Sequence, residues 1–98
     1  MSFEILIEPE VLEDIRNSHA YYEEKLDGLG DRFIEEVTKC IEDIKLNPYY
    51  EVRYGKIRCV PLKVFPYLIH FALREETAEI TIHAVFNTYQ NPDKYPKK

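Results

Sequence analysis

Two kinds of side chain in the second half of this 98-residue sequence could do chemistry on an anionic partner. Arg58, Lys63 and Arg74 could form a phosphate-binding patch, or they could be edge-strand charges that keep a sheet from pairing with other chains. His70 and His83 fall on the same face of neighbouring predicted strands, where two imidazoles could move protons to and from a reacting substrate. The commoner role of such residues is that of ordinary, half-buried sheet histidines. The candidate catalytic residues are therefore Arg58, Lys63 and His83, and Arg74 is a further candidate for binding.

Aromatic residues near the end of the chain add a third candidate feature. Tyr89 and Tyr95 lie on either side of Lys94, and aromatic rings beside a cation are the usual platform for stacking a nucleobase. Tail tyrosines more often pack back against a sheet through their apolar rings. Tyr89 and Tyr95 are kept as candidate catalytic residues, and Lys94 as a candidate contact to phosphate or to a partner protein.

The net charge of −5 is distributed unevenly along the chain. Residues 1–51 hold 14 acids and 5 bases, a net charge of −9, whereas residues 52–98 hold 4 acids and 8 bases, a net charge of +4. A negative average argues against a general nucleic-acid-binding protein. We therefore expect an anionic partner to contact the second half.

The composition is that of one small folded domain, spanning residues 1–98. The apolar share of 45%, with 8 Tyr and 5 Phe, is enough for one hydrophobic core. Cys40 and Cys59 show no CxxC or Cys/His spacing, so we expect free thiols, no metal site and no cofactor. No apolar run approaches the roughly 20 residues of a membrane span, and the start MSFEILIEPE lacks signal-peptide features. We expect a cytoplasmic protein with no membrane contact.

The first half of the chain predicts one strand and two helices. Alternating apolar residues predict a strand at residues 2–8. Pro9 suits the first turn of a helix, and apolar residues at three- and four-residue steps carry that helix to about Leu26. A second amphipathic run ends at Asn47-Pro48. The short loop between the helices predicts an antiparallel hairpin with one apolar stripe on each helix, and Leu12 is expected in the core.

The second half predicts three strands, at residues 56–64, 67–74 and 79–86. Their short connections make them an antiparallel meander, and the first strand should join beside the last. The predicted fold class is α+β: a two-layer β-α-α-β-β-β domain with the helical hairpin packed on one face of a mostly antiparallel sheet. Alternation predicts the residues under the helices: Tyr67, Ile69, Phe71, Leu73, Ile80, Ile82, Ala84 and Phe86.

Arg58 and Lys63 are an odd number of positions apart in the strand predicted at residues 56–64, so regular alternation would place them on opposite faces. Pro61 lies between them and cannot donate a ladder hydrogen bond. An edge position or a bulge near Pro61 would bring both bases to the open face of the sheet.

The stretch Val64-Phe65-Pro66-Tyr67 resembles the "FPY" strand pair of the RelE/ParE toxins, which are often labelled plasmid stabilisation proteins. The resemblance extends over nearly the whole chain through shorter pieces in the same order and spacing: Tyr21-Tyr22, residues 28–33, Asn47-Pro48 and residues 84–92. Each piece alone is an unspecific signal, and the resemblance depends on their shared order and spacing. It implies the RelE-like two-layer fold.

This resemblance implies the toxin half of a type II toxin-antitoxin system, which inhibits growth until a cognate antitoxin wraps over its surface. Members of the superfamily either cut mRNA on the ribosome without a metal ion or poison DNA gyrase. The cutting members gather basic residues on the open face of the sheet and in the C-terminal segment. Arg58 and Lys63 match that basic patch.

Three positions depart from the superfamily pattern. Leu68 stands where relatives commonly have arginine, and Asn87 and Gln90 stand in the segment where relatives have His-x-x-Arg. Leucine binds no phosphate, and neither amide can carry charge or act as a general base at neutral pH. Three hypotheses remain open: a ribosome-dependent endoribonuclease with altered catalytic positions, a gyrase-directed toxin that only binds, and a degenerate member that acts as a protein-binding module. The antitoxin and the oligomeric state are open as well.

Overall fold

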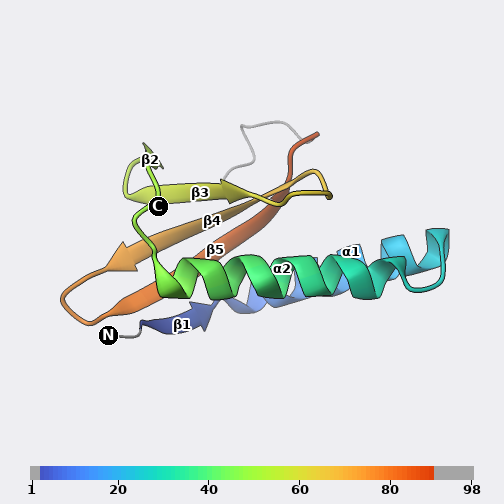
Figure 1. Ribbon diagram of the computed structural model, residues 1–98, viewed down its shortest axis with the longest axis horizontal. Helices are drawn as coiled ribbons and strands as arrows, with labels where there is room; N and C mark the ends of the chain where they lie inside the picture. The colour runs from blue at the N-terminus through green and yellow to red at the C-terminus, as the bar shows by residue number, and fades with distance from the viewer. Residues whose placement is uncertain (1–2, 90–98) are drawn as a thin grey trace.

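The predicted order of elements is present in the computed structural model, which describes residues 3–89. Figure 1 shows both helices along one face of the sheet. The two-layer α+β fold is confirmed, and the structure adds one short strand, β2. In chain order the elements are β1 (Glu4–Ile7), α1 (Pro9–Lys25), α2 (Leu29–Leu46), β2 (Val52–Tyr54), β3 (Ile57–Pro61), β4 (Tyr67–Arg74) and β5 (Glu79–Asn87).

The two helices present different amounts of surface to the core. In α2, Phe33, Val37 and Ile44 recur at steps of four and seven residues, and all three are buried. In α1 the fully buried residue is Val11, whereas Leu12, which was expected in the core, is 47% exposed. That prediction is wrong because neighbouring helical positions point about 100° apart, and Val11 faces the sheet.

Two glycines shape the turn between the helices. Gly28 has a φ of +86°, a left-handed conformation that side chains disfavour. Gly30 lies against α1, where a Cβ atom would be 2.5 Å from the His19 carbonyl oxygen. The turn therefore brings the start of α2 into close contact with the end of α1.

The sheet has the order β1-β5-β4-β3-β2. The predicted meander of β3, β4 and β5 is confirmed, and β1 lies beside β5 as expected, in parallel. The helices cover one face of this sheet and form a single core with it (Figure 1). The buried core residues are Val11, Phe33, Val37, Ile44, Val60, Leu62, Phe65, Tyr67, Ile69, Phe71, Ile80, Ile82 and Val85.

A bulge in β5 changes which residues face the helices. His70 pairs with Ala84 and Phe71 pairs with Ile82, so His83 is an extra residue between the two pairs. From that point the alternation is reversed: Val85 enters the core, and Ala84 lies on the opposite face with His70. The prediction that Ala84 and Phe86 face the helices is therefore wrong, because one inserted residue exchanges the two faces of a strand.

The added strand β2 forms a tight hairpin with β3. Gly55 has a φ of +52°, and the turn allows Val52 to pair with Arg58. Three residues are too few to show alternation, which is why the sequence did not predict β2. Neither of the helices in the described part of the chain has the length and apolar character needed to cross a membrane.

Candidate functional site

The sheet face opposite the helices holds a buried polar group at its centre. Cys59 on β3 pairs with His70 on β4, so both side chains lie on one face, and Tyr54 on β2 reaches the same ring. The Tyr54 hydroxyl is 2.9 Å from His70 Nδ1, and the Cys59 Sγ atom is 3.5 Å from it. We call Tyr54, Cys59 and His70 the sheet-face cluster.

Burial keeps His70 and Cys59 of the sheet-face cluster uncharged. It lowers the pKa of His70 from 6.5 to about 4, and the positive charge of Arg53 acts in the same direction. Burial also raises the pKa of Cys59, against a smaller opposite effect of Arg53. At neutral pH a neutral imidazole therefore faces a protonated thiol, and both the Cys59 thiol and the Tyr54 hydroxyl lie within hydrogen-bonding distance of Nδ1. The geometry is that of a hydrogen-bonded network and lacks the thiolate that a cysteine nucleophile requires.

The two sheet histidines have different partners. His70 is fully buried and contacts Tyr54 and Cys59, whereas His83 sits at the bulge with Nδ1 3.2 Å from the Glu8 carboxylate. The His83 side chain is 13% exposed. The two rings therefore lie in different surroundings, His70 within the sheet-face cluster and His83 beside a carboxylate.

The structure places Arg58 and Lys63 on different surfaces. Arg58 pairs with Phe71, a core residue, so it points to the helix side, where its guanidinium donates to the Tyr50 carbonyl oxygen at 2.6 Å. Lys63 is exposed in the connection after β3 and lines a groove beside α2. The expectation that a bulge would bring both bases to the open face is not met, because β3 keeps regular pairing with β4 through Pro61.

A groove between α2 and β3 has a volume of about 460 Å³. Glu36 on its wall accepts hydrogen bonds from the Val64 and Phe65 amides and so fixes the β3–β4 connection to α2. We call this hollow the α2 groove. It is lined by Arg32, Glu35, Glu36, Lys39, Cys40, Asp43, Tyr50, Val60, Pro61, Leu62 and Lys63, a mixture of both charges over an apolar floor.

The remaining candidates lie apart from both of these sites. Arg74 is exposed at the end of β4 and pairs across the sheet with Glu79. Tyr89 is 86% exposed and borders a hollow beside α1, with its amide bonded to the Asn87 side chain. Lys94 and Tyr95 fall outside the described residues.

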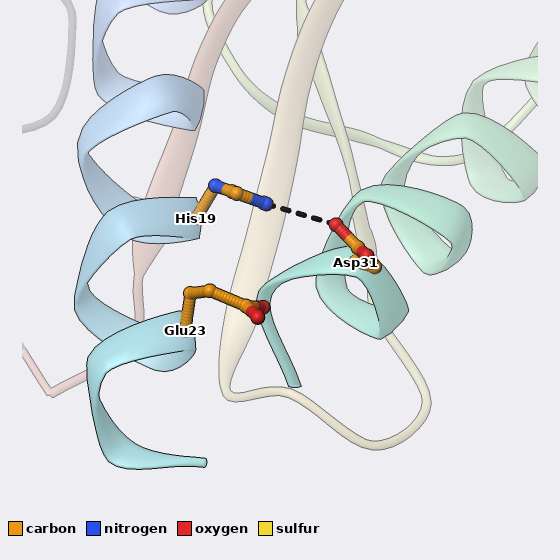
Figure 2. A group of neighbouring side chains, drawn as sticks. All are labelled: His19, Glu23 and Asp31. Carbon is orange, nitrogen blue, oxygen red and sulfur yellow. Dashed lines mark hydrogen bonds and ion pairs between the residues drawn. The ribbon is translucent and has the colours of Figure 1, made fainter. Parts of the chain in front are cut away.

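Sequence reasoning missed two members of the sheet-face cluster, Tyr54 and Cys59. Neither belongs to a motif, and only the cross-strand register brings Cys59 beside His70. Among the described residues, a group of side chains that could hold a metal ion lies away from the sheet-face cluster, where His19, Glu23 and Asp31 gather between the helices (Figure 2).

The comparison with solved structures identifies the fold. A chain of the structure described as "Chromosomal ParDE TA system from P. aeruginosa" matches with a TM-score of 0.75, over 87% of this chain and 95% of that chain. The two sequences are 11% identical. This chain therefore has the fold of the RelE/ParE toxins, as the FPY resemblance implied. No family model matches the sequence, and no curated protein matches it.

Proposed function

We propose that this chain is the toxin component of a toxin-antitoxin pair, held inactive by a cognate antitoxin. The observation that carries this proposal is the likeness to a chain of a toxin-antitoxin system across nearly the full length of both chains. The sequence pieces that resemble the superfamily, Phe65-Pro66-Tyr67 among them, support the same assignment. This support is independent, because the structural match is at 11% sequence identity and rests on backbone shape.

The α2 groove and the neighbouring edge of β3 form the proposed antitoxin-binding surface. β2 pairs with Ile57 and Arg58, and no other strand within residues 3–89 pairs with the outer edge of β3 beyond Arg58. A partner strand can add its backbone hydrogen bonds at such an edge while its side chains enter the adjacent groove. Val64, 69% exposed beside Lys63, adds an apolar contact at the end of this surface.

The toxin acts by binding its target and cuts no RNA efficiently. Metal-free phosphoryl transfer needs an accessible acid-base group and a cation near the phosphate, each contributing on the order of a hundredfold in rate. On the sheet face His70 is buried and neutral, the mostly buried His83 lies 3.2 Å from the Glu8 carboxylate, and Arg58 points to the helix side. Leu68 supplies no charge. DNA gyrase is therefore favoured over the ribosome as the target.

Expression of the gene alone and together with its neighbouring open reading frame tests the proposal. Growth should stop in the first case and continue in the second, with a change in DNA supercoiling and with messenger RNA left intact. Rapid mRNA cleavage would overturn the binding mechanism. Unimpaired growth, together with a neighbour product that does not bind, would overturn the toxin assignment.

Charge reversal at Lys63 locates the antitoxin interface. Lys63→Glu should weaken the complex about tenfold at low salt and less at high salt, because Lys63 borders the α2 groove. Arg74→Glu is the matched control, since Arg74 is also exposed and lies at the far end of β4 from Lys63. Equal effects of the two variants would indicate general charge attraction and not a defined surface.

A further inference from the structure

The end of the helical hairpin carries three ligating side chains that no motif connects. His19 and Glu23 project from α1 toward Asp31 at the start of α2 (Figure 2). One ligand atom from each lies within 4.8 Å of the other two. We propose that this hairpin cluster, His19, Glu23 and Asp31, binds a divalent transition-metal ion of the zinc type and that the ion fastens the two helices together.

The spacing of the ligand atoms is close to that required. His19 and Glu23 are four residues apart and therefore share one face of α1. His19 Nε2 is 3.0 Å from Asp31 Oδ1. Nitrogen and oxygen ligands bind zinc at about 2.0–2.2 Å, which separates tetrahedral ligands from one another by about 3.4 Å. The Asp31 side chain is 74% exposed and can make the adjustment of about 1 Å that closes the site.

Backbone hydrogen bonds orient the Glu23 carboxylate in advance. Its Oε2 atom accepts from the Gly28 amide at 2.8 Å, and its Oε1 atom accepts from the Gly30 amide at 2.9 Å. A carboxylate has about four lone-pair positions, so both oxygens can still bind an ion. Such outer hydrogen bonds are typical of carboxylate metal ligands. The missing side chain at Gly30 is what allows α2 to approach His19 closely enough.

The ligand types select the class of ion. One imidazole nitrogen with two carboxylates suits zinc and its transition-metal neighbours, whereas magnesium and calcium prefer oxygen ligands alone. Binding requires the lone pair of His19 Nε2, so the neutral ring carries its proton on Nδ1 and the ion takes the place of the hydrogen bond to Asp31. The two carboxylates balance the charge of the ion. Three protein ligands leave one coordination position for water.

Zinc titration into the purified, metal-free full-length protein tests this site, with calorimetry and thermal unfolding as readouts. At a free zinc concentration of about one hundred times the dissociation constant, the midpoint of unfolding should rise on the order of 10–20 °C. His19→Gln and Asp31→Asn should weaken binding at least tenfold and so reduce this rise by about half or more. Glu24→Gln, an exposed change on the same helix, should leave both unchanged.

Three results would overturn the proposal. The first is the absence of zinc binding to the unmodified protein. The second is a full zinc response in His19→Gln that disappears in Cys59→Ser, which would place the ion at the sheet-face cluster. The third is an equal rise in midpoint with magnesium, which would show only that a dication screens the acidic first half of the chain.

Discussion

His70 lies within the sheet and His19 lies near the turn between the helices, and their environments are opposite. His70 is fully buried in the sheet-face cluster, where its partners are a phenol and a thiol. His19 is about one-third exposed in the hairpin cluster, and its partners are carboxylates. The first ring is held neutral by burial, whereas the second lies among groups that attract cations.

This difference teaches that surroundings, more than residue type, decide what each histidine can do. The sheet-face cluster lies at the centre of the surface where the superfamily resemblance implied chemistry, yet it is built as a hydrogen-bonded network. The hairpin cluster lies at a turn for which the sequence predicted only an antiparallel helical hairpin, yet His19 and Asp31 are accessible there. Changes in the first region should therefore affect folding, and changes in the second should affect ion binding.

The largest expected effect in this comparison comes from removing the buried ring. His70→Ala should lower the free energy of unfolding by about 2–4 kcal/mol, because it leaves a cavity and removes the partner of Tyr54. Chemical denaturation measures this change. A loss below about 0.5 kcal/mol would show that the sheet-face cluster is not part of the folded core.

The second-largest effect should be the pH dependence of the free energy of unfolding, which distinguishes the two histidines. The pKa of His70 is about 4 in the folded protein and near 6.5 when unfolded. Between these two values the unfolded chain binds more protons than the folded protein. The contribution of the neutral His70 ring to the free energy of unfolding is therefore complete above pH 6.5. It is lost as the pH falls toward 4, by up to about 1.4 kcal/mol per pH unit. His70→Gln should remove this slope and His19→Gln should keep it. The same slope in both variants would show that His70 does not cause this pH dependence.

Crowding at the helix turn should produce an intermediate effect. Gly30→Ala places a Cβ atom 2.5 Å from a backbone oxygen that cannot rotate away, so α1 and α2 must separate, at about 1–3 kcal/mol. Gly28→Ala is the control, since there is open space around it and only its positive φ opposes a side chain, at about 1 kcal/mol. Thermal unfolding compares them, and a smaller loss for Gly30→Ala than for Gly28→Ala would contradict the close contact.

The smallest effect should come from the exposed histidine without metal. His19→Gln removes an exposed contact with the Asp31 carboxylate, and such exposed contacts contribute about 0–1 kcal/mol. Metal-free protein in denaturant should show a loss within that range. A loss as large as that of His70→Ala would mean that His19 also stabilises the fold through packing, and the contrast between the two regions would fail.

Local patterns in the sequence determined the elements and most of their order. Amphipathic spacing located α1 and α2, alternation located β1, β3, β4 and β5, and short connections predicted the antiparallel meander. These features depend on neighbours within a few positions. The expectation of free thiols likewise followed from the cysteine spacing, and Cys40 and Cys59 are free.

Only the tertiary structure decided which side chains meet. One inserted residue, His83, exchanged the faces of Val85 and Phe86, and no local pattern marks a bulge of that kind. Cross-strand register brought Cys59 to His70, and regular pairing turned Arg58 toward the helices. His19 and Asp31 are twelve positions apart and meet because Gly30 lets two helices touch. Such contacts depend on how segments distant in the sequence pack against each other, and the spacing of residues along the chain does not predict this packing.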